Sequence, residues 1–533
     1  MKRWLMGSVT ALVMSGGAAQ ADFTLHVLHT NDFHSRVESI NKYDSTCDAE
    51  TEAKNECFGG IARMGAKINE LRDTLKADGQ NVIVLDAGDQ YQGSLFYTTY
   101  KGKDTVEFMN AIGYDAMAVG NHEFDDGPGG LQILAEGAKF PVVSGNLDLS
   151  QSPELKGKVG GALTLEVGGE KIGIVSALAM DTPETAAPGD KVIFKDDMDS
   201  LKAEVQELSD AGVTKIIALT HTGYKRDQEF AAQVPGIDAL IGGHSHTLLG
   251  DMDGAEGPYP TMVKGADGTE VPVATAYAYG KYLGHLQLTW DDKGKLIKVE
   301  GAPILLDASV VPDEKLAARV KEMSAPINEL KAKRVAEIAA PIDGGRTTCR
   351  VKECEMGDVV ADAMLARVKD QGITIAIQNG GGLRASIDAG PVTMGDVLSV
   401  LPFQNTLSTF QLKGADVVAA LENGASQMEE GAGRFSQVSG LKYTVDPAAP
   451  AGSRISEVLV RDGQNWVPID TNATYGVVSQ NYMRSGGDGY KVFAEKAINA
   501  YDFGPDLADV LADYLAKQGP GFAPKLDGRI TVK

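Results

Sequence analysis

Short runs of His, Asp and Asn recur in the first half of the chain, each directly after an apolar stretch. They are "NDFH" (31–34), "GDQ" (88–90), "GNHEFD" (120–125), "THTG" (220–223) and "GGHSH" (242–246). Five of the eight histidines of the chain fall in these runs. Imidazole nitrogens and carboxylate or amide oxygens are ligands of borderline-to-hard divalent ions. The runs therefore predict a metal site built without cysteine.

Each run alone also has a simpler interpretation. Asp-x-His is compatible with a solvated loop, Gly-Asp with a turn, and Gly-Asn-His with a helix cap. Taken together, the runs predict seven metal ligands: Asp32, His34, Asp89, Asn121, His221, His244 and His246. Two ions roughly 4 Å apart need a carboxylate that bridges them, and Asp89 lies in the central run. We therefore expect Asp89 to be the bridging ligand.

The elements that must position these runs are strands of an α/β sandwich. From residue 23 to about 308, short β-branched runs such as "NVIVLDAGDQ" and "KIIALTHTG" alternate with helical stretches such as "GIARMGAKINELRDTL". Continuous apolar runs of this length are typical of buried strands covered by helices. Every polar run follows the carboxyl end of its strand, which is where open α/β folds gather their sites.

The second half of the chain follows a different pattern. Residues 312–335 form a long, charged, mostly helical stretch, and the chain beyond it mixes helices, short strands and glycine turns. A chain of 533 residues exceeds what one core usually supports. We expect a first domain at 22–311, a helical connector at 312–335 and an α+β domain at 336–533.

The N-terminus resembles a secretory signal peptide over residues 1–21, with Lys2 and Arg3 before an apolar run and "AQA" at the end. We expect an exported protein without a membrane anchor, in a periplasm rather than outside the cell. The net charge of -23 argues against a nucleic-acid partner. The four cysteines form two close pairs, Cys47 with Cys57 and Cys349 with Cys354, which predict two disulfides in an oxidising compartment. A zinc site is the alternative, although neither pair has CxxC spacing.

Four stretches of the second half carry residues suited to binding a nucleotide. They are "CRVKECEMGDVVADAM" (349–364), "IQNGGGLRASI" (377–387), "LPFQNT" (401–406) and "QNYMRSGGDGY" (480–490). An Arg such as Arg384 can bind a phosphate or a ribose hydroxyl, and Phe403 and Tyr482 can stack on a base. The simpler interpretations are a surface arginine and two core rings.

The five runs of the first half, in this order, resemble the calcineurin-like metallophosphoesterases, and "GGIAR" (59–63) with the second half resembles their 5'-nucleotidase branch. The resemblance implies a four-layer α/β/β/α domain with two divalent ions, Zn, Mn, Co or Fe. It places Asp32, His34, Asp89 and His246 around one ion, and Asp89, Asn121, His221 and His244 around the other. It also implies that Arg350, Asn379, Arg384 and Asp488 contact phosphate, ribose or base edges, and that Phe403 and Tyr482 stack on the base.

His122 then acquires a catalytic role, because its neighbour Asn121 holds a metal while its own ring faces the substrate and is oriented by Asp125. A protonated imidazole stabilises charge or protonates the leaving oxygen, worth about two to four orders of magnitude in rate. The alternative is a structural histidine, and Glu123 receives no role. A large rotation of the C-terminal domain about the connector is also implied.

The resemblance implies hydrolysis of nucleoside 5'-phosphates. The alternatives are a UDP-sugar or nucleoside di- or triphosphate hydrolase, a 2',3'-cyclic phosphodiesterase with 3'-nucleotidase activity, a thiosulfohydrolase, and a secreted nucleotide-binding protein without catalysis. One departure from the family pattern is Tyr482 at a position that is often Phe. The sequence leaves the oligomeric state open.

Overall fold

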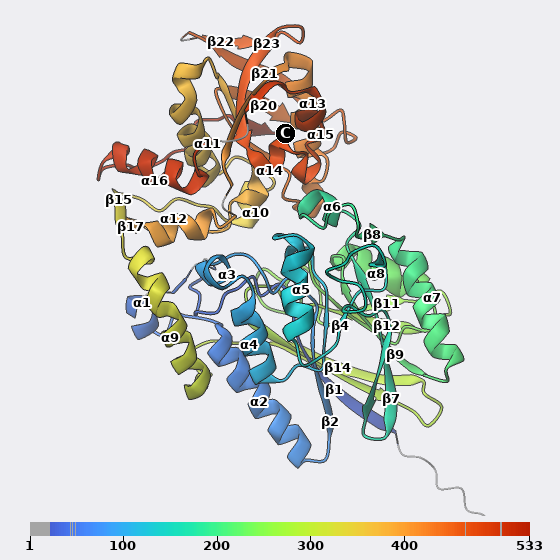
Figure 1. Cartoon of the computed structure of the whole chain (residues 1–533). Coiled ribbons are helices and arrows are strands. Elements are labelled where there is room, and N and C mark those ends of the chain that lie inside the picture. Colours follow the sequence, from blue (N-terminus) through green and yellow to red (C-terminus); the bar gives the residue numbers. More distant parts are fainter. Residues whose placement is uncertain are drawn as a thin grey trace, which may run out of the picture.

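The computed structural model describes residues 22–42, 44, 46–47, 49–403, 405–463, 465–501 and 504–533. The expected signal peptide, residues 1–21, lies outside the described residues. The chain forms two bodies, one from each half of the sequence (Figure 1). Helix α9 (Glu314–Lys331) connects them along the chain and packs on the first body, where it contacts α2 and α3, and it also contacts α12 of the second body. The domain boundaries at 311 and 336 stay predictions.

The first body is built on two six-stranded sheets that face each other. One sheet has the order β14-β13-β1-β2-β3-β4 and the other β11-β12-β10-β9-β7-β6. The strands of the first are β14 (Leu296–Leu305), β13 (Tyr282–Trp290), β1 (Phe23–Thr30), β2 (Asn81–Asp86), β3 (Ala116–Ala118) and β4 (Val142–Val143). Those of the second are β11 (Thr261–Lys264), β12 (Glu270–Ala274), β10 (Ala239–Gly242), β9 (Lys215–His221), β7 (Glu170–Leu178) and β6 (Leu163–Val167).

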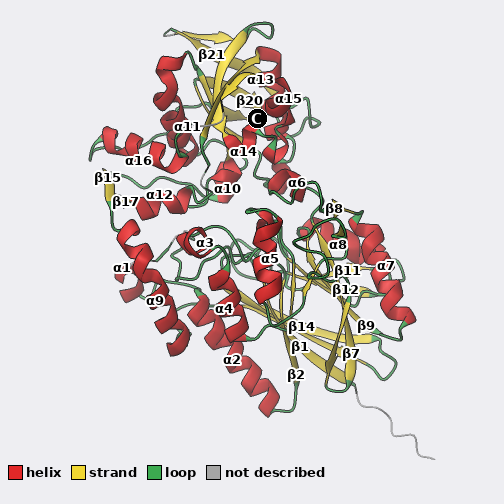
Figure 2. Cartoon of the chain, in the orientation of Figure 1, coloured by secondary structure: helices red, strands yellow, loops and turns green. Residues whose placement is uncertain are grey.

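Helices cover the outer face of each sheet (Figure 2). The first sheet is covered by α2 (Ile61–Ala77), α3 (Leu95–Tyr100), α4 (Lys103–Ile112) and α5 (Pro128–Gly137), and the second by α7 (Asp197–Asp210) and α8 (Tyr224–Gln233). Helix α2 packs on its sheet because its buried residues Ile61, Met64 and Ile68 recur at helical spacing on one face. Between the sheets, Val27, Leu85 and other side chains form a separate apolar core. This arrangement confirms the four-layer α/β/β/α prediction.

The remaining elements of this body are short. They are α1 (Ala49–Ala53), the 3-10 helix η1 (His122–Phe124), α6 (Thr182–Thr185), and the paired strands β5 (Leu147–Asp148) and β8 (Ile193–Phe194).

The second body is α+β, as predicted. Its five-stranded sheet has the order β19-β16-β23-β18-β24, with β19 (Ser436–Ser439), β16 (Ile375–Asn379), β23 (Thr474–Gln480), β18 (Leu407–Lys413) and β24 (Ile498–Tyr501). A four-stranded sheet contains β22 (Asn465–Pro468), β21 (Ile455–Asp462), β20 (Leu441–Val445) and β25 (Ile530–Val532), and β15 (Arg334–Ile338) pairs with β17 (Gly390–Thr393). One apolar core packs under α11 and α16, and the other under α13.

The helices of the second body are α10 (Arg346–Cys349), α11 (Glu355–Val368), α12 (Met394–Val400), α13 (Gly414–Ala425), α14 (Asn481–Arg484), α15 (Lys491–Lys496) and α16 (Leu507–Gln518). Its 3-10 turns are η2 (Lys369–Gln371), η3 (Gly380–Gly382), η4 (Met428–Glu430) and η5 (Gly487–Gly489). Among the described residues, every helix is too short or too polar to cross a bilayer.

The predicted metal ligands follow the carboxyl ends of five strands. Strands β1, β2 and β3 run parallel in the first sheet, and β9 and β10 run parallel in the second. Parallel strands bring their carboxyl ends to one edge of a sheet. The loops after β1, β2 and β3 therefore meet those of β9 and β10 at the edge that faces the second body.

Candidate active site

Left-handed backbone conformations recur among the predicted metal ligands at this edge. Asp32, His34, Asp89, His244 and His246 have φ between 49° and 81°. Residues other than glycine rarely adopt this left-handed region, and such strain concentrates at functional sites. Gly120 is required for the same close approach, because a Cβ there would lie 2.3 Å from the backbone nitrogen of Asp89. These backbone conformations direct the side chains of the predicted ligands toward one point.

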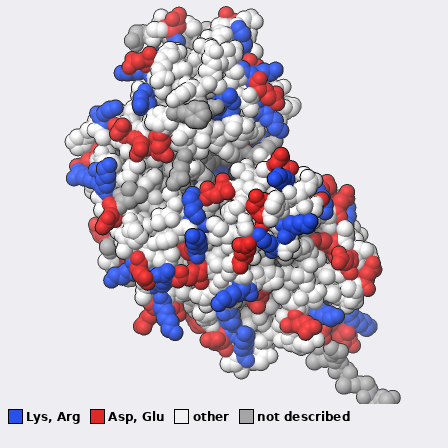
Figure 3. All heavy atoms as spheres, viewed as in Figure 1, with Lys and Arg blue, Asp and Glu red and all other residues white. Residues whose placement is uncertain are grey.

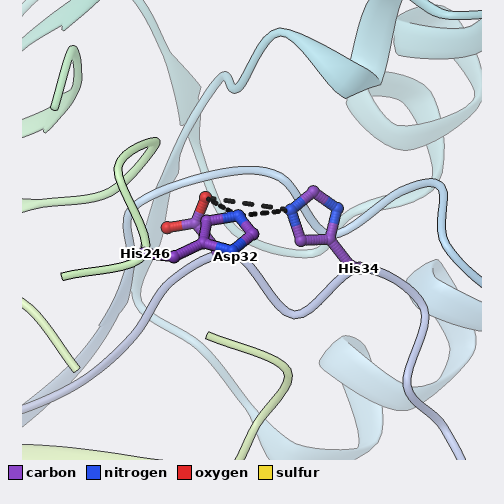
Figure 4. A group of neighbouring side chains, drawn as sticks. All are labelled: Asp32, His34 and His246. Atoms are coloured by element: carbon purple, nitrogen blue, oxygen red, sulfur yellow. Dashed lines mark hydrogen bonds and ion pairs between the residues drawn. The ribbon is translucent and has the colours of Figure 1, made fainter. Parts of the chain in front are cut away.

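Asp32, His34 and His246 converge in one group (Figure 4). The Nε2 atoms of His34 and His246 are 2.9 Å apart, and the Oδ1 atom of Asp32 lies 3.3 Å from Nε2 of His246 and 3.9 Å from Nε2 of His34. All three residues are buried.

Asp89, Asn121, His221 and His244 form the adjoining group. Oδ2 of Asp89 is 3.2 Å from Nε2 of His221, and Oδ1 of Asn121 is 3.2 Å from the same nitrogen and 2.9 Å from Nδ1 of His244. Oδ2 of Asp89 also lies 3.8 Å from Nε2 of His34 in the first group. Asp89 therefore stands between the two groups, as a bridging carboxylate must.

Three of the four imidazoles predicted as metal ligands are neutral, whereas the fourth, His221, is held cationic by the carboxylates beside it. Burial opposes protonation of His221, but Asp89 and Asp32 outweigh it and raise its pKa to about 10. Burial lowers the pKa of His244 to about 3 and holds the pKa values of His34 and His246 well below 6.5, so each ring is neutral at pH 7. Nδ1 of His246 has no hydrogen-bond partner among the described residues. Neutral imidazoles crowded beside buried carboxylates are the donor set that divalent ions prefer. The residues present therefore fit two divalent ions.

His122 lies beside this centre and contacts an acid of its own. Its Nδ1 atom is 2.7 Å from Oδ2 of Asp125, and its backbone N–H donates to Oδ1 of Asp89 at 2.9 Å. Burial opposes protonation of the ring, but the carboxylates of Asp125 and Asp89 outweigh it and raise the pKa of His122 above 6.5. The ring stays cationic to a higher pH than a free histidine.

Glu123, to which the sequence assigned no role, joins the loops that carry the ligands. Its carboxylate is fully buried and accepts backbone N–H groups from four residues, Asp89, Gln90, Tyr91 and Gly120, at 2.8–3.1 Å. The loop after β2 is thereby tied to the loop after β3. An acid within "GNHEFD" is a weak signal, because nothing in the run shows which backbone groups it meets.

A cavity of about 980 Å³ lies between the two bodies and contains the exposed side of this centre. It is lined by His34, Asp89, Asn121, His122, His244 and His246 on one side, and by Arg350, Asn379, Arg384, Phe403, Tyr482 and Asp488 on the other. The structure thus brings together all six residues predicted to bind substrate. Asp32, Asp125 and His221 lie outside the lining of the cavity and contact the residues that line it.

Five arginines line this cavity, and three of them, Arg346, Arg350 and Arg384, lie close enough to one another to interact electrostatically. Burial, and then the nearby Arg346 and Arg384, holds the pKa of Arg350 well below its ordinary value. The Nε atoms of Arg350 and Arg384 have no hydrogen-bond partner within the described part of the chain. Crowded cations with unused donors match a polyanionic group such as a phosphate. On the outer surface in Figure 3, by contrast, acidic and basic side chains are interspersed.

Arg346 was missed by the sequence analysis. It begins the one-turn helix α10, four residues before Arg350. Residues four apart share one face of a helix, so this spacing was the available signal.

Three of the remaining predicted residues, Asn379, Tyr482 and Asp488, form a hydrogen-bond network in the cavity lining. Nδ2 of Asn379 donates to Oδ2 of Asp488 at 2.6 Å, and the Tyr482 hydroxyl donates to Oδ1 of Asp488 at 3.2 Å. The ring of Phe403 lies 6.0 Å from that of His122 and 5.7 Å from the guanidinium carbon of Arg384. Both predicted disulfides, Cys47–Cys57 and Cys349–Cys354, are present, and the second closes the loop that carries Arg350.

Comparisons with known proteins agree with this geometry. Residues 25–248 match the model of calcineurin-like phosphoesterases, and residues 332–495 match that of the 5'-nucleotidase C-terminal domain. The chain is 36% identical to snake venom 5'-nucleotidase of Gloydius brevicauda, covering 96% of this chain and 89% of that protein. It is also 36% identical to 5'-nucleotidase of Homo sapiens, covering 96% and 91%.

Among solved structures, a 5'-nucleotidase precursor from Thermus thermophilus superimposes with a TM-score of 0.90 at 41% identity, over 96% of this chain and 99% of that chain. This similarity extends along nearly the whole chain and agrees with the fold, the metal-ligand constellation and the cavity. On these grounds the chain belongs to the 5'-nucleotidase family.

Proposed function

We propose that the chain hydrolyses nucleoside 5'-monophosphates to nucleoside and inorganic phosphate. The observation that carries this proposal is the division of the cavity. One wall holds the metal-ligand constellation, and the other holds the guanidinium groups of Arg346, Arg350 and Arg384 beside two aromatic rings. In a nucleoside phosphate, the phosphate group suits the metal-ligand wall and the nucleoside suits the wall with the aromatic rings.

In this proposal, Asp32, His34, Asp89 and His246 hold one divalent ion, and Asp89, Asn121, His221 and His244 hold the other. When bound, such a pair of ions, Zn, Mn, Co or Fe, supplies Lewis-acid activation of water and neutralises phosphoryl charge. Arg346, Arg350 and Arg384 add positive charge from the opposite wall. The phosphate is thereby held between the two bodies.

His122 assists departure of the nucleoside. Asp125 engages Nδ1 and keeps the ring oriented, which leaves Nε2 for the substrate. A cationic imidazole at that position stabilises the developing alkoxide or protonates it. The nucleoside 5'-oxygen thus leaves as a hydroxyl.

The C-terminal body recognises the nucleoside. Asn379 and Asp488 offer an amide and a carboxylate to the sugar, and Phe403 and Tyr482 offer ring faces to the base. A volume of 980 Å³ lies at the upper end of the usual range for small-molecule sites, about 300–1,000 Å³. Such a volume leaves room for UDP-sugars or nucleoside di- and triphosphates, which are the second class of substrate to test.

We place the protein outside the cytoplasm, in a periplasm. The two disulfides support this location, because such bonds persist in oxidising compartments.

The test is phosphate release from AMP, ADP, ATP, UDP-glucose, 3'-AMP and 2',3'-cyclic AMP, with the metal content of the protein measured in parallel. Each substrate is assayed with chelator and after re-addition of Mn or Co. Fast release from AMP that chelation abolishes and metal restores is the expected result. Faster release from another of these compounds would identify that compound as the preferred substrate. The absence of metal-dependent hydrolysis for all of them would overturn the proposal.

A further inference from the structure

The hydroxyl of Tyr482 makes two hydrogen bonds to one residue, Asp488. It donates to Oδ1 of the carboxylate at 3.2 Å and accepts from the backbone N–H of the same residue at 3.2 Å. The other carboxylate oxygen, Oδ2, accepts from Nδ2 of Asn379 at 2.6 Å. The carboxylate is therefore held at both oxygens by groups of the protein.

The backbone around Asp488 explains why such an anchor is needed. Asp488 has φ 51° and ψ 31°, a left-handed conformation that carries a cost for residues other than glycine. The preceding residue is Gly487, where a Cβ would lie 2.5 Å from the Tyr482 ring. The ring thus rests against the backbone of η5, which fixes its hydroxyl beside Asp488.

The Tyr482 hydroxyl remains a hydrogen-bond donor, and the Asp488 carboxylate can still accept hydrogen bonds from a ligand. Burial, and then Asp488, raises the pKa of Tyr482 well above its ordinary value, so the hydroxyl stays protonated. Each carboxylate oxygen has two lone pairs, and Oδ1 and Oδ2 each use one of these on the bonds described. An anionic acceptor repels phosphate and attracts a hydroxyl donor, and in a nucleotide such donors belong to the sugar.

We propose that the Tyr482 hydroxyl positions Asp488 to accept a sugar hydroxyl, and so makes the chain selective for ribonucleotides over deoxynucleotides. This inference rests on the proposed function. It assigns Tyr482 a positioning role in addition to stacking, a role that phenylalanine at the same position lacks.

The test is Tyr482→Phe, which keeps the ring for stacking and removes only the hydroxyl. We measure kcat and KM for AMP, 2'-deoxy-AMP, 3'-deoxy-AMP and 4-nitrophenyl phosphate with metal-loaded enzyme. The variant should raise KM for AMP about tenfold, leave kcat within about twofold, and reduce by a similar factor the preference for AMP over at least one deoxy analogue. Values for 4-nitrophenyl phosphate, which has no sugar, should not change.

Two further variants separate positioning from a general structural effect. Tyr443→Phe removes another buried tyrosine hydroxyl of the same body, one that donates to the carbonyl of Ser436 and lies outside the cavity lining. It should leave the preference for AMP unchanged. In an Asp488→Gly background, where glycine accepts the left-handed backbone, Tyr482→Phe should add no more than about twofold to KM.

An unchanged ratio of AMP to both deoxy analogues in Tyr482→Phe would overturn the inference, as would an equally large added effect in the Asp488→Gly background. Failure of the proposed function has a different signature. In that case the unmodified enzyme hydrolyses 4-nitrophenyl phosphate but not AMP, before any variant is compared.

Discussion

At the scale of single residues, Asp125 and Asp126 are neighbours with different partners. Asp125 contacts Nδ1 of His122, whereas Asp126 accepts from the Tyr97 hydroxyl at 2.8 Å and pairs with Lys101 at 3.1 Å. The two acids thus offer a matched comparison for the proposed catalytic pair.

We predict that His122→Gln lowers kcat for AMP by about 10²–10⁴-fold, because it removes the proton donor. Asp125→Asn should lower kcat by a smaller factor, since the ring remains but loses its oriented charge. Asp126→Asn is the control and should leave kcat within about twofold. Stopped-time phosphate assays with saturating metal provide the measurement, and equal losses in Asp125→Asn and Asp126→Asn would refute a specific role for Asp125.

Residue types and spacing were enough to predict that the metal-ligand candidates meet at one edge of the sheets, because the strand pattern fixes where each polar run emerges. The residues of the second body that line the cavity were implied by the family resemblance, not by their spacing. Residue types and spacing were not enough for Arg346 or Glu123. The role of Glu123 depends on the positions of four backbone N–H groups from two loops, and that of Arg346 on how α10 faces a different body. Such roles arise from tertiary packing, which has no local pattern in the sequence.

At the scale of elements, an acidic pair joins α11 to the C-terminal strand. Glu353 accepts backbone N–H groups of Asp527, Gly528 and Ile530 at 3.0 Å, while Asp358, on α11, lies beside it. Burial, and next the Glu353 carboxylate, raises the pKa of Asp358 to about 9, although Arg529 opposes the shift. The folded chain therefore keeps a proton that the unfolded chain releases near its ordinary pKa of 3.8.

Because the pKa of Asp358 is higher in the folded than in the unfolded chain, the free energy of unfolding falls as the pH rises. The favourable contribution of protonated Asp358 is complete below about pH 4 and is lost as the pH rises toward 9. We predict that Asp358→Asn, which keeps a donor toward Glu353, raises the melting temperature at pH 8 by a few degrees, since 1 kcal/mol shifts it by about 2–4 °C in domains of 150–250 residues. The gain should be much smaller at pH 5. Thermal unfolding at both pH values tests this, and a variant less stable than the parent at pH 8 would contradict it.

At the scale of the whole molecule, the described residues of the two bodies meet through few polar contacts. Lys225 of α8 lies 3.7 Å from Glu430 of η4, and a guanidinium nitrogen of Arg36 donates to the carbonyl of Arg384 at 3.4 Å. Lys225, Glu430 and Arg384 all line the cavity. We therefore infer that the bodies separate to exchange substrate and product.

We predict that cross-linking the bodies abolishes repeated turnover. Cysteines introduced at 225 and 430, joined by a short reducible bis-maleimide, should lower the steady-state rate with AMP by more than about tenfold, because lid and domain motions gate product release. Cleavage of the linker should restore the rate. Single-cysteine variants treated identically control for modification, and full activity of the cross-linked protein would show that the motion is not needed.

The division of the cavity has an evolutionary consequence. In the proposed function, the groups that cleave the ester belong to one body and the groups that recognise the nucleoside belong to the other, so we expect that mutations can alter specificity without disturbing the chemistry. A lineage of such proteins can therefore acquire new substrates by changing the loop that carries Phe403 and the short helix α14 that carries Tyr482, while the same centre continues to cleave the ester. A change of substrate needs few mutations in this architecture, because its two tasks are encoded by separate segments of the gene.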